Sequence, residues 1–166
     1  MQKITTCLWF DDQAEEAARY YTSVFRNAKV GKITRAPAGG EPYVTQGAVL
    51  TVEFEVEGNG FVALNGGKVD FAFNDAISFQ VSCADQAEVD EYWSKLTADG
   101  GREVQCGWLK DKYGLSWQIV PEALTRLIAD SDKAKAGRVM AAMMQMVKID
   151  IAKLEEAAAG QQAKVA

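Results

Sequence analysis

A four-residue string occurs twice in this chain, each time between a strand-like and a helix-like segment. Asp12-Gln13-Ala14-Glu15 recurs 73 positions later as Asp85-Gln86-Ala87-Glu88. An Asp followed three residues later by Glu is typical of a capping box, in which both side chains accept hydrogen bonds from unpaired amides at a helix N-terminus. The same string at the same place in two strand–helix pairs predicts an internal duplication.

The segments around each copy also correspond. Residues 3–10 and 77–83 have the composition or alternation of strands, and each string is followed by apolar residues at helical spacing. These apolar stripes are Ala14, Ala17, Ala18, Tyr21, Val24 and Phe25 in the first copy and Val89, Tyr92, Trp93 and Leu96 in the second. Three further strand-like segments follow each helix. Each copy therefore predicts the order β-α-β-β-β.

The chain after the second copy has a different pattern. Pro121 suits the start of a short helix that runs to Ala129, and the stretch 133–159 is rich in alanine and methionine. Asp150 is placed to cap a second helix within this stretch. We expect an α+β fold of two tandem βαβββ units, at 1–75 and 76–121, with a C-terminal helical tail at 122–166, together forming one domain.

Charge and residue usage exclude several classes of function. The chain contains no histidine, which removes the commonest general base and metal ligand and any Ser-His or Cys-His nucleophile pair. Eighteen Lys and Arg stand against 23 Asp and Glu, a net charge of −5. Nucleic acid is not an expected partner, because phosphate binding needs a basic face.

The three cysteines, Cys7, Cys83 and Cys106, match neither a CxxC zinc site nor a disulfide framework. Unpaired thiols are typical of a reducing compartment. The first residues do not resemble a signal peptide, and no apolar run is long enough for a membrane span. We therefore expect a cytoplasmic protein without a membrane partner.

Several strings together resemble one known family along about the whole chain. They are Leu8-Trp9-Phe10, Ala63-Leu64-Asn65-Gly66-Gly67, Cys106-Gly107-Trp108-Leu109-Lys110-Asp111 and Gly114-Leu115-Ser116-Trp117-Gln118-Ile119-Val120-Pro121. The chain resembles the PhnB-like branch, also named the 3-demethylubiquinone-9 3-methyltransferase domain, of the vicinal oxygen chelate superfamily. That superfamily includes glyoxalase I, extradiol dioxygenases and bleomycin-resistance proteins. The resemblance implies the tandem βαβββ fold and a homodimer, with sheets cupped around a small molecule.

The resemblance also suggests where such a molecule binds. In metal-using relatives, side chains from the first and last strands of each unit project into the cup, and the matching positions here are Thr5, Asn65, Ser78 and Gln118. All four are uncharged, and neutral oxygens are poor ligands for a divalent ion in a half-buried site. We therefore expect no metal and no other cofactor. These residues would instead hydrogen-bond a ligand, with Trp108 and Trp117 as flat walls.

The catalytic residue is not identified, and Cys106 is the candidate. A lysine near a thiol favours the thiolate, and Lys110 follows four positions later. A free cysteine without a histidine base is more often a small buried residue, so that interpretation is preferred.

Three classes of function remain open. The preferred one is a small-molecule binding protein without a tightly held metal. The alternatives are a metal-dependent lyase, isomerase or dioxygenase, and a methyltransferase-related protein. The last is disfavoured, because no Gly-rich turn opens a helix of a parallel α/β sheet.

Overall fold

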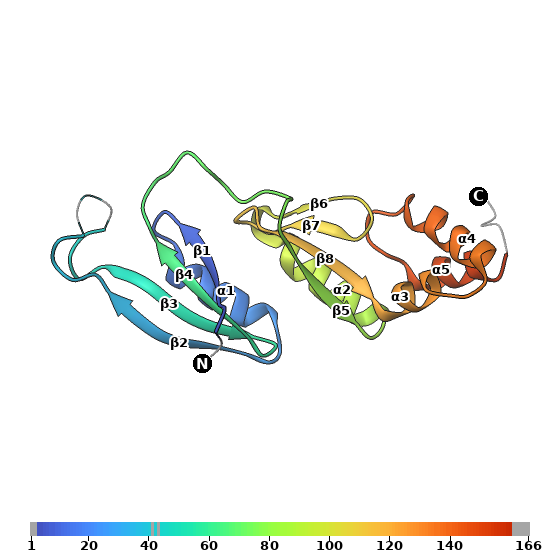
Figure 1. The fold of residues 1–166 in the computed structure, drawn as a ribbon, viewed down its shortest axis with the longest axis horizontal. Coiled ribbons are helices and arrows are strands. Elements are labelled where there is room, and N and C mark those ends of the chain that lie inside the picture. Colours follow the sequence, from blue (N-terminus) through green and yellow to red (C-terminus); the bar gives the residue numbers. More distant parts are fainter. Residues whose placement is uncertain (1–2, 41, 43, 161–166) are drawn as a thin grey trace. The chain divides into compact units, whose positions relative to one another are not determined.

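The computed structural model describes residues 3–40, 42 and 44–160. The chain divides into two compact units, Met1–Phe71 and Ala72–Ala166. Figure 1 shows the first in blue to green and the second in green to red. Among the described residues, no helix combines the length and the apolar character needed to cross a bilayer.

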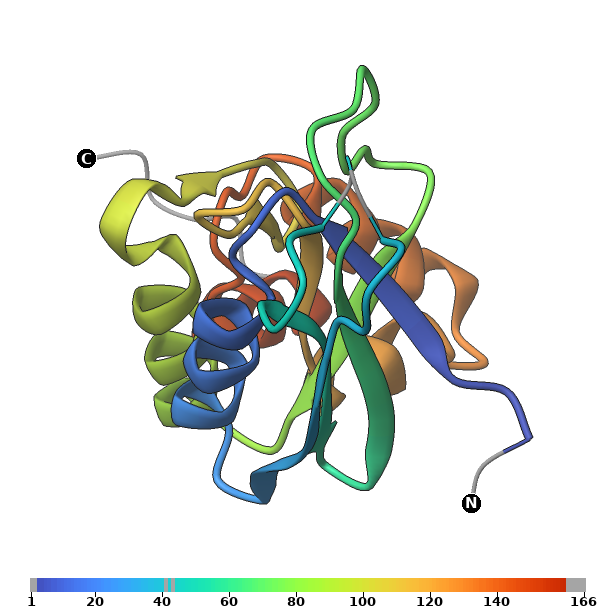
Figure 2. The ribbon, with the colours of Figure 1, turned by 90° about the vertical axis from the view of Figure 1, so that its left-hand side faces the viewer.

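The first unit is a four-stranded sheet with one helix packed against it (Figures 1 and 2). Its elements are β1 (Thr6–Phe10), α1 (Ala14–Val24), β2 (Ala28–Arg35), β3 (Val49–Val56) and β4 (Asn59–Asn65). The strands lie in the order β1-β4-β3-β2, with β1 parallel to β4 and the other pairs antiparallel. The sheet is therefore mixed.

The second unit repeats this arrangement. Its elements are β5 (Ser78–Cys83), α2 (Gln86–Thr97), the 3-10 turn η1 (Ala98–Gly100), β6 (Arg102–Glu103), β7 (Trp108–Lys110) and β8 (Ser116–Pro121). The strand order β5-β8-β7-β6 matches that of the first sheet, and β5 is again parallel to β8. The expected α+β fold with tandem βαβββ units is confirmed.

The predicted apolar stripes of both helices are buried against their own sheets. In the first unit, the Tyr21 ring of α1 stacks on Phe54 of β3 with centroids 5.8 Å apart, and Phe54 stacks on Phe61 of β4 at 5.1 Å. Aromatic pairs at such distances add to the free energy gained by burial alone. The helix-facing side of the sheet is therefore the core of the unit.

The two copies of the repeated string make different contacts at the start of their helices. At α2 the predicted cap by Asp85 is confirmed, because its side chain accepts from Glu88 N–H at 2.9 Å; the Glu88 carboxylate accepts from Ala84 N–H, one residue before the N-cap. At α1 the capping box is wrong. The helix begins at Ala14 without a cap from Asp12 or Gln13, and Asn65 Oδ1 accepts from Ala14 N–H at 2.7 Å instead. A side chain 51 positions away replaces the local one.

The C-terminal helices are α3 (Glu122–Ile128), α4 (Lys133–Met143) and α5 (Ile151–Ala158). Apolar residues of these helices and of the segment before α5 form a cluster, which contains Leu124, Leu127, Val139, Ile149, Leu154 and Ala158. The Asp150 side chain accepts from Lys153 N–H at 3.2 Å, so the predicted cap of the last helix is confirmed. We call residues 133–160 the C-terminal extension.

Backbone contacts attach this extension to the loop between β6 and β7. Cys106 N–H and Gly107 N–H donate to Met146 O and Val147 O, both at 2.8 Å. Gly107 has φ +82°, and a Cβ there would lie 3.0 Å from Ile149 Cγ1. Glycine is thus required both for the backbone conformation and for the close approach of the extension.

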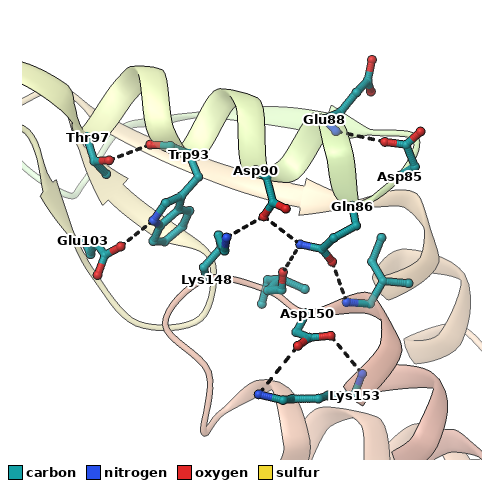
Figure 3. A network of polar contacts seen from close by, with 12 residues as sticks. Asp85, Gln86, Glu88, Asp90, Trp93, Thr97, Glu103, Lys148, Asp150 and Lys153 are labelled. Carbon is teal, nitrogen blue, oxygen red and sulfur yellow. Dashed lines mark hydrogen bonds and ion pairs between the residues drawn. The ribbon is translucent and has the colours of Figure 1, made fainter.

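Side chains of α2 complete the attachment (Figure 3). The Gln86 amide nitrogen donates to Ile149 O at 3.2 Å, and its amide oxygen accepts from Ile151 N–H at 2.9 Å. Lys148 forms an ion pair with Asp90, and this contact together with Gln86 lowers the pKa of the Asp90 carboxyl. The repeated glutamine therefore has acquired a structural role in the second unit.

Candidate functional site

The second sheet presents one covered and one open face. Strand alternation directs Leu109, Trp117 and Ile119 toward α2, and all three are buried. The alternate residues, including Trp108, Lys110, Ser116 and Gln118, lie on the opposite face. We call this second side, which α2 does not cover, the open face of the second unit; Trp108 and Gln118 are partly exposed on it, whereas Lys110 and Ser116 are buried.

Three of the predicted ligand-binding residues are neighbours on this open face. Trp108 and Gln118 are cross-strand partners on β7 and β8, and Gln118 Nε2 donates to Ser78 Oγ of β5 at 2.8 Å. All three are partly exposed. The patch therefore combines a flat apolar ring with an amide and a hydroxyl that can contact the same small molecule.

Sequence analysis missed a charged group on the same face. Lys110 is only 9% exposed, and its ammonium lies 2.9 Å from Asp75 Oδ1. Ser116, fully buried, donates from Oγ to the same carboxylate oxygen at 2.7 Å. Hydrogen bonds from Lys110 and Ser116 hold the pKa of Asp75 below its ordinary value, so this carboxyl is ionised at neutral pH. Strand alternation could have indicated this position, because Lys110 is two residues after Trp108 on one strand and therefore lies on the same face.

Trp117 lies on the face toward α2 and is 5% exposed. Its indole nitrogen donates to Asp111 Oδ2 at 2.8 Å, while Asp111 Oδ1 accepts from the amides of Tyr113 and Leu115. Asp111 is thereby fully engaged in shaping the turn between β7 and β8. The structure corrects the expected placement, because the two tryptophans lie on opposite faces of the sheet.

Thr5 and Asn65 belong to the first unit. Thr5, exposed and directly before β1, lines a hollow of about 530 Å³ whose other lining residues include Glu53, Glu55 and Val62. Asn65 lies on the opposite, helix-facing side and is 8% exposed. Besides its bond to Ala14, it donates from Nδ2 to Val49 O at 3.0 Å. The expectation that Thr5 and Asn65 share a surface is thus corrected: strand alternation separates them.

Cys106 adopts φ +60° in the loop before β7 and is partly buried. Its Sγ lies 3.8 Å from Met144 Sδ of the C-terminal extension. In the described part of the chain, the Lys110 ammonium contacts Asp75 rather than this thiol. Lys110 is therefore not in the position in which it would favour the thiolate of Cys106.

The donor chemistry of the predicted positions does not suit a divalent metal. Both polar groups of Asn65 are engaged with backbone, and Gln118 is bonded to Ser78. Across residues 3–40, 42 and 44–160, no three His, Cys, Asp or Glu side chains gather as a metal site would require. Zn²⁺ sites use thiolates, imidazoles or carboxylates, and Ca²⁺ and Mg²⁺ sites include carboxylates among their oxygen ligands.

Comparison with known proteins gives the family. Residues 2–120 match the family model described as 3-demethylubiquinone-9 3-methyltransferase. A PhnB protein from Bacillus cereus, provisionally named as such a methyltransferase, is 33% identical, with a TM-score of 0.64. The match covers 72% of this chain and 99% of that one. No curated protein matches the chain.

Two fosfomycin resistance proteins share the fold at lower identity. FosX from Mesorhizobium loti is 15% identical with a TM-score of 0.51, over 78% of this chain and 100% of that chain. FosX from Listeria monocytogenes, in its monoclinic form at pH 6.5, is 18% identical with a TM-score of 0.50, over 75% and 94%. On the family match, the identity to the Bacillus protein and the duplicated fold, this chain belongs to the PhnB-like 3-demethylubiquinone-9 3-methyltransferase family of the vicinal oxygen chelate superfamily.

Proposed function

We propose that this protein binds a small, partly apolar molecule on the open face of the second unit. The observation that carries the proposal is the adjacency of Trp108, Gln118 and Ser78 on three neighbouring strands. Trp108 offers a flat surface to a planar or apolar group. Gln118 and Ser78 offer a donor and acceptors to a polar group beside it.

Rigid positioning supports the same proposal. Gln118 and Trp108 are carried on strands of one sheet whose covered face is packed on α2, so neither needs to be ordered when a ligand arrives. A preformed surface loses less conformational entropy on binding than a loop does. Uncharged hydrogen-bonding groups beside an aromatic ring suit a ligand with one polar edge.

The family name suggests a methyltransferase, but the arrangement of the strands does not favour this function. Both described sheets are mixed four-stranded sheets. Adenosine-containing cofactors are commonly held by a glycine-rich turn between a parallel strand and a helix. The metal-dependent alternative would need charged ligands that the predicted positions lack. A stoichiometric divalent ion in freshly purified protein, bound at Thr5, Ser78 or Gln118, would contradict the metal-independent proposal.

The test uses the whole chain and a panel of small aromatic and aliphatic acids, amides and alcohols. A compound that binds the native state raises the melting temperature by mass action. We expect a binding compound to shift the Trp108 indole NMR resonance, assigned with Trp108→Phe, and to bind at least tenfold more weakly to Gln118→Leu. The control is Gln13→Leu, which changes an exposed glutamine of the first unit. A compound that binds without shifting the Trp108 resonance and with unchanged affinity for Gln118→Leu would show that the site lies elsewhere and would refute the proposal.

We also propose a homodimer in a reducing, cytoplasmic compartment. The dimer rests on the family likeness. The compartment is supported by Cys7, Cys83 and Cys106, which are all free thiols. Light scattering during size-exclusion chromatography checks the dimer, and a mass of one chain would contradict it. Cell fractionation checks the compartment.

A further inference from the structure

Donor side chains form a row across all four strands of the second sheet. Arg102 pairs with Lys110 between β6 and β7, Lys110 with Ser116 between β7 and β8, and Ser116 with Ser78 between β8 and β5. Paired residues project to the same face of a sheet. One line of the open face therefore carries a guanidinium, an ammonium and two hydroxyl groups.

The two residues at the centre of this row are buried. The Lys110 side chain is 11% exposed and Ser116 is fully buried. A largely buried ammonium is stable only with an anionic partner, because losing that partner leaves a desolvated charge. The row therefore requires an anion at this point.

The anion at this position is the side chain of an exposed residue in a connecting segment. Asp75 lies in the stretch before β5, outside any helix or strand, and its side chain is 66% exposed. One carboxylate oxygen takes both contacts, from Lys110 at 2.9 Å and from Ser116 at 2.7 Å. Solvent screens the exposed Asp75 carboxylate of this ion pair. An anion from outside can compete with it.

We propose that Arg102, Lys110 and Ser116 form a binding site for the oxyanion group of a small molecule, and that Asp75 is a built-in competitor displaced when the molecule binds. This inference rests on the proposed function and deepens it. A ligand whose planar or apolar part lies on Trp108 and whose polar edge meets Gln118 would extend its carboxylate or phosphate to Lys110. Trp108 and Lys110 are two residues apart on β7 and face the same side.

If Asp75 is a tethered competitor, its removal should tighten the binding of an outside anion. The apparent dissociation constant for an outside anion equals the intrinsic one divided by the fraction of protein in which Asp75 is displaced. If Asp75 occupies the donors for about nine-tenths of the time, its removal tightens binding about tenfold. A purely structural ion pair predicts no gain, since its removal would only destabilise the unit.

The experiment measures binding of inorganic phosphate and, separately, of acetate to the whole chain. The readout is the backbone amide shifts of Lys110 and Ser116 in NMR spectra, which report on folded protein only. We expect Asp75→Ala to bind one of these probes about tenfold more tightly than the unsubstituted chain. The probe that gains more identifies the head group as phosphate or carboxylate. Asp75→Asn, similar in shape, replaces Asp75→Ala if the latter does not fold.

Two further variants make the result specific. Asp70→Ala removes an exposed acid of the same stretch of chain and lowers the net negative charge equally. We expect it to leave the affinity within twofold of the unsubstituted chain. Lys110→Met combined with Asp75→Ala is expected to abolish the gain. Equal affinities for Asp75→Ala and Asp70→Ala would overturn the inference and leave Asp75 as an anchor.

The outcomes separate this inference from the proposed function. The compound panel detects contact with Trp108 and Gln118, whereas phosphate and acetate detect Lys110 and Ser116. A panel in which binding ignores Trp108 refutes the proposed function without affecting a tenfold gain in Asp75→Ala. Conversely, compounds that bind at Trp108 while Asp75→Ala shows no gain refute the anion site alone.

Discussion

Replacing Gln86 by alanine removes the side chain that joins α2 to the start of α5 (Figure 3). Two of its hydrogen bonds, with Ile149 O and Ile151 N–H, reach the backbone of the C-terminal extension. An intramolecular hydrogen bond contributes about 0.5–1.5 kcal/mol net, so the pair contributes about 1–3 kcal/mol. Because Gln86 is only half-buried, water replaces part of the loss. We expect Gln86→Ala to cost about 1–2 kcal/mol.

The loss should be local, and hydrogen exchange measures it. Amides of residues 146–158 are expected to exchange about 5- to 30-fold faster in Gln86→Ala, which is the factor that about 1–2 kcal/mol implies. Amides of the first unit should be unchanged. Chemical denaturation provides the corresponding change in the free energy of unfolding.

The internal repeat supplies a matched control. Gln13 holds the same place in the first copy of the string, is exposed, and makes no capping hydrogen bond through its side chain. Gln13→Ala should change stability by less than about 0.5 kcal/mol. If exchange of residues 146–158 in Gln86→Ala stays within twofold of Gln13→Ala, then Gln86 does not attach the extension and the reasoning is refuted.

Three further predictions concern single sites. Asn65→Ala, which removes the cap of α1, should cost about 1–2 kcal/mol in denaturation, and Asp12→Ala less than about 0.5; the opposite order would contradict the assigned cap. Gly66→Ala places a Cβ 2.1 Å from the Trp9 ring and should cost about 1–3 kcal/mol, with loss of near-ultraviolet circular dichroism; an unchanged spectrum would count against it. Burial raises the pKa of Cys83 to about 12, while the unfolded thiol ionises near 9.0, so stability should fall as pH rises above 9. Iodoacetamide at pH 8 should label Cys83 more slowly than both other cysteines, as checked by mass spectrometry.

The order of elements and their buried faces were predictable from sequence, because both depend on local periodicity. A helix buries residues three and four apart, and this rule located the stripes of α1 and α2 on Tyr21 and Trp93. Asp150 was recognised as a cap for the same reason, since its partner amide is three residues away. The duplication was visible because two copies kept the same short string.

The site was predictable only in part. Ser78 and Gln118, carried over from the family pattern, are hydrogen-bonded to each other, and Trp108, proposed for its flat ring, is the cross-strand partner of Gln118. Trp117 and Asn65 lie on the covered faces, because a shift of one residue along a strand reverses the direction of a side chain. The face to which a side chain points depends on the exact position of the residue in the paired strand, and the local sequence pattern does not determine that position.

The sequence by itself determined the repeated βαβββ order, the helical extension and the absence of histidine chemistry. Tertiary structure decided which of two identical strings caps its own helix and which amide binds a distant backbone. It also decided that Lys110, Ser116 and Asp75 come together across 41 positions of chain. Local pattern follows from backbone geometry within a few residues. Contacts between distant residues depend on register and packing, which only the folded chain sets.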